Sequence, residues 1–302
     1  MNSRTELAVV TSRLRVEEKL IFAALEARGA RFERVDDAQL QLEAARPDPP
    51  RWPTIWNRSL AYGRTLYATQ ILEQQGALCV NSAHVVATCG DKAATSLALG
   101  ASGTPTPRTL VAFTVESALE ACETLGFPCV LKPVVGSWGR LVARLDSRSA
   151  AEAVLEDRAV LGSWQHSIFY LQEYIEKPGR DARAFVVGDE CIAAIWRYSD
   201  HWITNTARGG RVEAAPADGP IGELSLRAAR AVGGGLLAVD LIETPDGLSV
   251  LEVNHSGEFR NSIAPTGVDI PGAMADWVLR QASERSEEDA AETPVTAKEV
   301  LA

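Results

Sequence analysis

The sequence predicts an α/β fold, with α+β character in its later part, that opens with a small doubly wound domain. Two observations predict it. Up to about residue 90, short apolar runs alternate with amphipathic helical stretches, which is the pattern of β-α-β units on a parallel sheet. From Asp91 the pattern changes, and after residue 175 strands dominate. The length of 302 residues suffices for two or three compact units, and we expect them at 1–90, 91–172 and 173–282.

The first unit contains the elements of a doubly wound domain. Leu7–Val10 is a short apolar run typical of a buried strand, and small apolar residues then recur near helical spacing until Gly29. Prolines between 44 and 53 predict a loop. The other elements expected here are a strand at 32–35, a helix at 64–75 and a strand at 77–81.

The second unit begins with a helix at 91–99 that Gly100 closes. Thr114 is a residue type that caps helices, so it predicts a helix over 115–125. An apolar strand followed by a glycine-bounded turn predicts a hairpin. The hairpin has its strands at 127–133 and 141–144, and the remaining elements are strands at 110–113 and 168–175 and a helix at 150–155.

The third unit consists mostly of strands. They are expected at 183–187, 191–198, 238–243 and 248–253, with helices at 221–232 and 271–282. The residues at 283–302 are rich in Glu, Ala and Ser, and this composition at a chain end predicts a disordered tail.

Composition excludes several classes of protein. A hydrophobic content of 46% is ordinary for a globular protein, and the net charge of −10 argues against a nucleic-acid binder. No apolar run reaches the roughly 20 residues that span a bilayer, and the N-terminus lacks the pattern of an export signal. The cysteines have no metal-ligand spacing, so we expect reduced thiols in a cytoplasmic protein. They are Cys79, Cys89, Cys122, Cys129 and Cys191.

The first candidate for chemistry is a lysine before a turn. Lys132 ends an apolar strand, and the turn from Gly136 to Arg140 follows it. Backbone N–H groups of such a turn can approach phosphate oxygens while the lysine supplies a charge beside them. An ordinary hairpin turn explains this feature equally well when it is taken alone.

The second candidate is a set of oxygen ligands. Glu252 and Asn254 lie two apart on a strand, so their side chains share a face. If the strand that carries Asp240 pairs beside them, two carboxylates and an amide oxygen converge. Mg²⁺ takes such oxygens while it bridges nucleotide phosphates. A solvated polar face of a sheet is the alternative interpretation.

The third candidate is the strand Gln172-Glu173-Tyr174-Ile175, which runs into the turn Pro178-Gly179-Arg180-Asp181. Backbone groups at the end of such a strand can face an adenine edge, and a nearby carboxylate can hold a ribose hydroxyl.

In their order along the chain, these three features and Lys92 resemble the ATP-grasp superfamily, over about residues 5–280. The stretches 89–96, 132–140, 176–181 and 201–210 further resemble the LysX and ArgX ligases, which are related to the RimK-type glutamate ligases. The resemblance implies an ATP-grasp fold behind a pre-ATP-grasp domain, with ATP and Mg²⁺ as cofactors. It implies ligation of the α-amino group of 2-aminoadipate or glutamate to the C-terminal glutamate side chain of a small acidic carrier, LysW. It also suggests a dimer or tetramer.

The resemblance implies roles for individual residues. It assigns Asp240, Glu252 and Asn254 to magnesium. To ATP it assigns Lys92, Lys132, Gly136, Ser137, Trp138, Gly139, Arg140, Gln172, Glu173, Tyr174, Ile175, Arg180, Asp181, Arg183 and Asn205. To the amino acid it assigns Arg197, Thr206, Ala207, Ser256, Gly257, Glu258, Phe259, Arg260, Asn261 and Ser262.

The chemistry of the reaction adds expectations. Lys132 should offset charge on the phosphates, and Arg208 or Arg211 could hold the acceptor carboxylate or the transferring phosphate. Arg197 and Arg260 suit the carboxylates of the amino acid. The dipeptide Asn261-Ser262 has the form that the family associates with aminoadipate, which makes the aminoadipate ligase of lysine biosynthesis the main prediction.

One departure from the family pattern leaves alternatives open. Gly257 stands where these ligases usually have a bulkier residue, so a larger or altered pocket is expected. The alternatives are a glutamate–carrier ligase in arginine, ornithine or secondary metabolism, and a RimK-like ligase acting on another protein or peptide. A nucleotide-binding module without turnover is a third alternative, although it should lack a magnesium ligand or a phosphate lysine.

Overall fold

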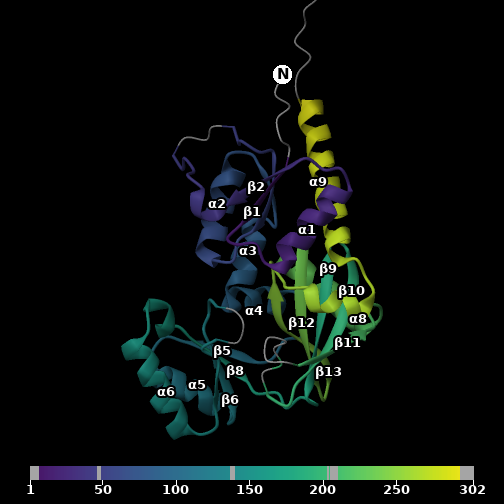
Figure 1. Cartoon of the computed structure of the whole chain (residues 1–302). Coiled ribbons are helices and arrows are strands. Elements are labelled where there is room, and N and C mark those ends of the chain that lie inside the picture. Colours follow the sequence, from purple (N-terminus) through teal and green to yellow (C-terminus); the bar gives the residue numbers. More distant parts are fainter. Residues whose placement is uncertain (1–6, 46–48, 137–139, 203, 205–209, 293–302) are drawn as a thin grey trace, which may run out of the picture. The chain divides into compact units, whose positions relative to one another are not determined.

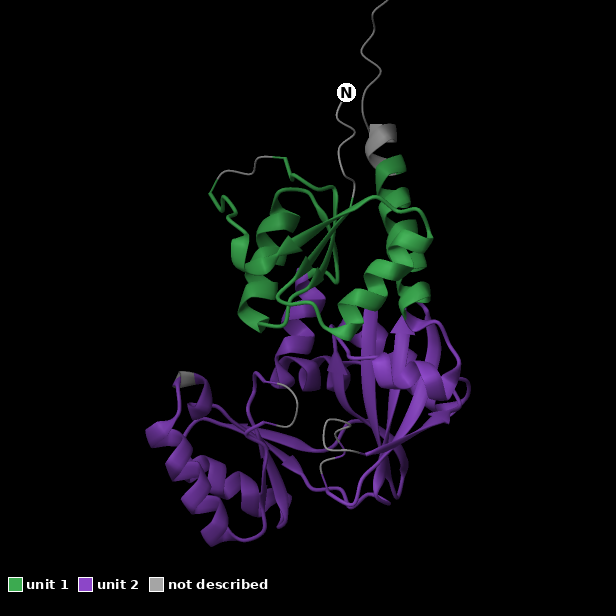
Figure 2. Cartoon of the chain, viewed as in Figure 1, with its two compact units in different colours: residues 1–82, 271–302 green, residues 83–270 purple. Residues whose placement is uncertain are grey.

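The computed structural model describes residues 7–45, 49–136, 140–202, 204 and 210–292. The chain forms two compact units, one of residues 1–82 with 271–302 and one of residues 83–270 (Figure 2). Among the described residues, no helix combines the length and the apolar character needed to cross a bilayer.

Unit 1 contains a parallel sheet with the strand order β2-β1-β3-β4. Its strands are β1 (Leu7–Thr11), β2 (Phe32–Asp36), β3 (Thr54–Arg58) and β4 (Leu78–Val80), and its helices include α1 (Val16–Ala27) and α2 (Tyr62–Gln74). Because all pairs are parallel and the strand order runs outward from β1 in both directions, the predicted doubly wound topology is confirmed. The short helix η1 (Asp37–Gln39) follows β2.

The strand β3 was not expected from the sequence. All five of its residues are buried, including Asn57 and Arg58. The amide of Asn57 donates to Thr69 Oγ1 at 3.1 Å, and Arg58 lies 3.4 Å from Glu18. Polar side chains that find partners inside the unit can be buried, so the apolar pattern alone misses this strand.

The last helix, α9 (Ile270–Glu292), ends later than expected. The sequence predicts a helix end at residue 282 and a disordered tail from 283, but the helix continues through ten of those tail residues. Ala, Glu and Arg are strong helix formers, so the composition that predicts a tail also suits a helix. In unit 1, Arg28 at the end of α1 pairs with Asp276 of α9 at 2.5 and 2.7 Å. Residues 293–302 lie outside the described residues.

The first sheet of unit 2 has the order β5-β8-β6-β7 and is antiparallel. It consists of β5 (Thr109–Ala112), β6 (Cys129–Lys132), β7 (Ala143–Leu145) and β8 (Phe169–Glu173). Two helices, α5 (Val115–Leu125) and α6 (Arg148–Leu161), pack on it (Figure 1). The Thr114 side chain accepts from Ser117 N, so the predicted cap of α5 is confirmed. The short helix η2 (Trp164–Ser167) precedes β8.

The second sheet of unit 2 has the order β11-β10-β9-β12-β13, again antiparallel. Its strands are β9 (Arg180–Val187), β10 (Glu190–Tyr198), β11 (Arg211–Ala215), β12 (Leu236–Thr244) and β13 (Gly247–Asn254). One face is apolar and packs on helices α3 (Ala83–Gly90), α4 (Lys92–Ala101) and α7 (Pro220–Val232). The short helix α8 (Arg260–Thr266) follows β13 and contacts β10 and β11.

The unit boundaries differ from the expected ones in two places. Helix α3 belongs to unit 2 rather than to the first unit, because Val85 and Cys89 are buried in the core of the larger sheet. The C-terminal helix belongs to unit 1. Between Glu173 and Arg180 the chain passes from one sheet of unit 2 to the other, close to the expected division at 172.

Candidate active site

Lys92 stands at the first position of α4. The Asp91 side chain caps this helix by accepting from the N–H groups of Ala93 and Ala94. The ammonium group of Lys92 donates to the carbonyl of Gly136 at 2.7 Å and lies 3.1 Å from Glu252 Oε1. Lys92 therefore connects the start of the glycine turn to the end of the second sheet.

Lys132 is the last residue of β6 and is half-buried. Its ammonium group donates to Gln172 Oε1 at 2.5 Å. Loss of hydration is the main cause that lowers the pKa of Lys132, and Lys92 and Lys177 add to it while Glu252 opposes it, so that the pKa lies at about 8. Lys92 and Lys177 thus both act electrostatically on Lys132, and such a cluster attracts an anion.

Asp240 and Glu252 lie directly opposite each other where β12 pairs with β13, and Ala238 lies opposite Asn254. Paired residues of antiparallel strands project to the same face, so Asp240, Glu252 and Asn254 share one face of the sheet. The pairing on which the magnesium hypothesis depends is present. Val239 and Val253, between them, point into the apolar core.

Two arginines hold Asp240. Arg183 pairs with it through two bonds of 2.7 Å, and Arg197 contributes Nη2 at 3.3 Å. Burial raises the pKa of Asp240, but the two arginines outweigh burial and keep it below its ordinary value. Arg197 also donates from Nε to Asp181 at 2.7 Å. Arg197 is 6% exposed and bridges two aspartates, so its guanidinium group has buried protein partners already.

The donor set fits Mg²⁺. Within the described part of the chain, no three His, Cys, Asp or Glu side chains gather as ligands, so the set consists of two carboxylates and the amide of Asn254. The Asn254 Nδ2 atom is buried without a hydrogen-bond partner. The two ends of an amide are assigned from their surroundings, and a half-turn brings the oxygen to this position, where a cation satisfies it. Mg²⁺ keeps water or phosphate oxygens in its remaining positions.

Gln172 and Glu173 end β8 with their side chains engaged. The Gln172 side chain accepts a hydrogen bond from the Lys132 ammonium group and donates one to Thr109 Oγ1 at 3.1 Å. Glu173 Oε1 accepts from the backbone N–H of Arg108 at 2.7 Å. The Gln172 side chain therefore aims Lys132 through a direct bond. Beyond them, Tyr174 lies with its ring 5.1 Å from the Arg144 guanidinium.

Lys177 emerges from the structure as a site residue of its own. The sequence includes it only inside the stretch 172–183, and no spacing marks it out. Its ammonium group donates to Thr204 Oγ1 at 2.7 Å and lies 3.4 Å from Asp181 Oδ2. Burial lowers the pKa of Lys177, and Asp181 partly restores it.

Two expected arginines lie apart from this cluster. Strand alternation places Arg180 on the opposite face from Asp181 and Arg183, where it pairs with Glu243 through two bonds of 2.8 Å and covers the ring of Trp196 at 4.1 Å. Arg211 pairs with Glu213 on the edge strand β11, and its side chain is 65% exposed.

The connection between β13 and α8 carries the residues expected to bind the amino acid. Phe259 and Ser262 are buried, which suits a structural role, whereas Arg260 and Asn261 are exposed. The Ser256 hydroxyl is buried without a hydrogen-bond partner. Glu258 is half-buried, and so is Ile175 after β8, while Arg140 is exposed. Ser137, Trp138, Gly139, Asn205, Thr206, Ala207 and Arg208 lie outside the described residues.

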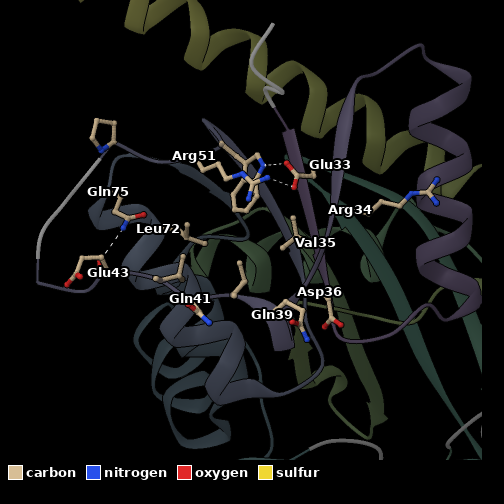
Figure 3. Close-up of a pocket in the computed structure, with 14 residues that line it drawn as sticks. Glu33, Arg34, Val35, Asp36, Gln39, Gln41, Glu43, Arg51, Leu72 and Gln75 are labelled. Atoms are coloured by element: carbon tan, nitrogen blue, oxygen red, sulfur yellow. Dashed lines mark hydrogen bonds and ion pairs between the residues drawn. The ribbon is translucent and has the colours of Figure 1, made fainter. Parts of the chain in front are cut away.

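Unit 1 contains a separate pocket of about 530 Å³ (Figure 3). Glu33 on its wall accepts from Trp52 Nε1 at 2.7 Å and from Arg51 at 2.8 Å. Gln75 donates to the carbonyl of Glu43 at 3.2 Å. No residue that the sequence predicts for ATP, magnesium or the amino acid lines this pocket.

Comparison with family models gives two matches that together span most of the chain. Residues 89–278 match the RimK-like ATP-grasp domain, and residues 7–88 match the LysX preATP-grasp domain.

Individual relatives agree with these matches. The chain is 34% identical to the alpha-aminoadipate–LysW ligase LysX of Saccharolobus solfataricus over 74% of this chain and 83% of the relative. It is 32% identical to the glutamate–LysW ligase ArgX of Sulfolobus acidocaldarius over 90% of this chain and 97% of the relative. Among solved structures, a RimK domain ATP-grasp protein from Sphaerobacter thermophilus aligns with a TM-score of 0.75 and 30% identity, over 91% of this chain and 99% of that one.

Proposed function

The chain belongs to the RimK-like ATP-grasp family, and from this premise we propose that it joins an amino acid to a small acidic carrier protein. The bond is an amide between the α-amino group of 2-aminoadipate and the C-terminal glutamate side chain of a LysW-like carrier, formed in lysine biosynthesis. Relatives named as alpha-aminoadipate–LysW ligases support this substrate pair. The observation that carries the proposal is the pairing of Asp240 with Glu252 across β12 and β13, with the Lys92 ammonium group 3.1 Å from Glu252.

The reaction must overcome the low reactivity of a carboxylate. Its negative charge repels an attacking amine, so ATP first transfers its γ-phosphoryl group to the carrier carboxylate and leaves as ADP. The amine then attacks the acyl phosphate, loses a proton and releases inorganic phosphate as the amide forms. Little covalent work falls to the protein in such a transfer, and positioning with charge neutralisation dominates.

We assign the phosphate contacts to the lysines. Lys132, aimed by Gln172, and Lys92, held at the start of α4, would supply positive charge to the phosphate chain. Lys177 is a third cation within electrostatic reach of Lys132. We also assign the turn from Gly136 to Arg140 to ATP, in line with the family resemblance.

We assign magnesium to Asp240, Glu252 and Asn254. When bound, the ion neutralises charge on the phosphates and orients them. Arg183 and Arg197 keep Asp240 ionised and fixed in direction, because each donates to its carboxylate. In this proposal the two arginines position a metal ligand, and Arg260 remains the candidate clamp for the amino acid.

Glutamate as the amino donor is the second candidate. The ArgX relatives align over 90% of this chain, against about three quarters for the LysX relatives. The dipeptide Asn261-Ser262 favours aminoadipate, and Asn261 is exposed where a substrate can reach it. Selectivity for one methylene in an apolar pocket is worth only about 1–3 kcal/mol, so placed polar groups must decide between the two donors.

We also propose a cytoplasmic enzyme that works as a dimer or tetramer, in line with the family resemblance. The function is tested by following ADP release from the purified enzyme with ATP, Mg²⁺, carrier and each amino acid. Release that requires carrier and aminoadipate together supports the proposal. ADP release that persists without carrier, or that needs an unrelated peptide in place of the carrier, contradicts the proposal. Such a result favours a RimK-like ligase or a ligase that uses a different amino donor.

A further inference from the structure

Gly257 lies unusually close to strand β12. A Cβ atom built on Gly257 falls 2.4 Å from the Cβ of Ala238 and 3.6 Å from its Cα. Carbon atoms in contact normally stay about 3.5–4.0 Å apart. Any residue other than glycine at 257 therefore requires the loop or the strand to move.

The position of this contact connects it to the candidate site. Ala238 lies two residues before Asp240 on β12 and directly opposite Asn254 on β13. Because alternate residues of a strand share a face, Ala238 and Asp240 point the same way. The chain that leaves β13 therefore folds back onto the face that carries the proposed magnesium ligands.

The segment around Gly257 is anchored on one side and contains a buried polar group without a hydrogen-bond partner. Ser256, directly before it, has a buried hydroxyl without a hydrogen-bond partner. Buried polar groups are almost always paired, so an unpaired one beside a candidate site indicates a contact made when a ligand binds. Phe259, two residues after Gly257, is completely buried and anchors the other side.

We propose that the Gly257–Ala238 contact is the positioning element of the amino-acid site. The missing side chain at 257 lets the segment 256–258 lie against β12, and this sets the distance between the Ser256 hydroxyl and the Asp240–Glu252 pair. The ligand class is an α-amino acid with a polar group for that hydroxyl. The inference rests on the proposed function. It also revises the expectation of a larger pocket, since Ala238 fills the space beside residue 257.

The test is a pair of variants, Gly257→Ala and the compensating Ala238→Gly/Gly257→Ala. The added methyl group must push the segment outward by roughly 1 Å, and a misplacement of that size costs on the order of 100-fold in rate. We expect kcat/KM for the amino acid to fall about 100-fold in the single variant, while KM for ATP changes less than about threefold. Removal of the Ala238 methyl group should restore at least about tenfold of the loss.

Gly100→Ala is the matched control. Gly100 is exposed on α4, and a Cβ atom there meets nothing within 4 Å. The same chemical change should therefore leave both KM values and kcat at the native level.

Each outcome decides the inference. Equal impairment of the single and double variants, or native behaviour of Gly257→Ala, overturns it. If Gly257→Ala fails to fold, the double variant must regain a cooperative melt, and its failure to do so also overturns the inference. The melting temperatures do not depend on any assay substrate. Rescue of the melt therefore supports the contact even if the native enzyme ligates neither aminoadipate nor glutamate. That last result would contradict only the proposed function.

Discussion

Lys132 combines a buried ammonium group with a lowered pKa. Loss of hydration, together with two neighbouring lysines, makes the protonated form less favourable and brings the pKa to about 8. A phosphate chain bound beside it reverses this tendency, because the anion favours the protonated form. The protonated form of Lys132 is therefore less favourable without nucleotide than with it.

The affinity for ATP should depend on pH through this group. Below about pH 8 Lys132 carries its proton and ATP binds fully; above it, binding must take up a proton, so affinity falls as pH rises. Calorimetric titration between about pH 6.5 and 9.5 measures this. Lys132→Met should bind ATP weakly, and its affinity should not fall as the pH rises. If the affinity for ATP falls with rising pH in the same way in both proteins, another group causes the decline.

Ligation should require Lys132 and Glu252 individually. We expect Lys132→Ala and Glu252→Ala each to lower kcat/KM by about 10³-fold or more, because each removes charge placed at the phosphates or their metal. Circular dichroism should still show a folded chain. Arg148→Ala, which removes an exposed pair with Glu123, is the control that retains activity. Full ligation by either site variant contradicts the assignment.

At the scale of elements, three neighbouring strands carry one buried ionic network. Strands β9, β10 and β12 contribute Arg183, Arg197 and Asp240, with Asp181 linked through Arg197. Buried charges need partners, and the removal of one leaves the others unpaired at a high cost. Glu252 lies on the edge strand β13, where its side chain is 31% exposed and forms an ion pair with Lys92.

This difference in burial predicts different stability effects for the two carboxylates that we propose as magnesium ligands. Asp240→Asn leaves Arg183 without its carboxylate and leaves the buried Arg197 with Asp181 alone, so we expect the free energy of unfolding to fall by about 3–5 kcal/mol. Glu252→Gln should lower it by less than about 1 kcal/mol, because solvent reaches that pair. Urea denaturation of both variants gives the comparison. Equal losses refute the proposed division between a buried and an accessible ligand.

Sequence reasoning succeeded where a residue type has one dominant local use. Thr114 as a helix cap follows from a local rule and is present, and the strand pairing that the magnesium hypothesis set as its condition is present as well. It failed where partners come from far along the chain. The buried polar strand β3 depends on such partners, and Lys177 becomes distinctive only beside Thr204, which lies 27 residues further along the chain.

At the scale of the whole molecule, the chain combines a doubly wound unit with an ATP-grasp unit. Its net charge is −10, and the proposed carrier is also acidic. Like charges on the two proteins disfavour association at long range, so local cations must recognise the carrier's carboxylate. In the proposed reaction the lysine cluster of unit 2 would supply these cations as well as the charge for the phosphates.

The most direct test is the intact mass of a LysW-like carrier after incubation with the enzyme, ATP, Mg²⁺ and equal amounts of aminoadipate and glutamate. The account predicts a gain of one aminoadipyl residue, located on the last residue of the carrier and absent with Lys132→Ala. A carrier of unchanged mass, recovered from a reaction in which the enzyme is folded and binds ATP, contradicts it.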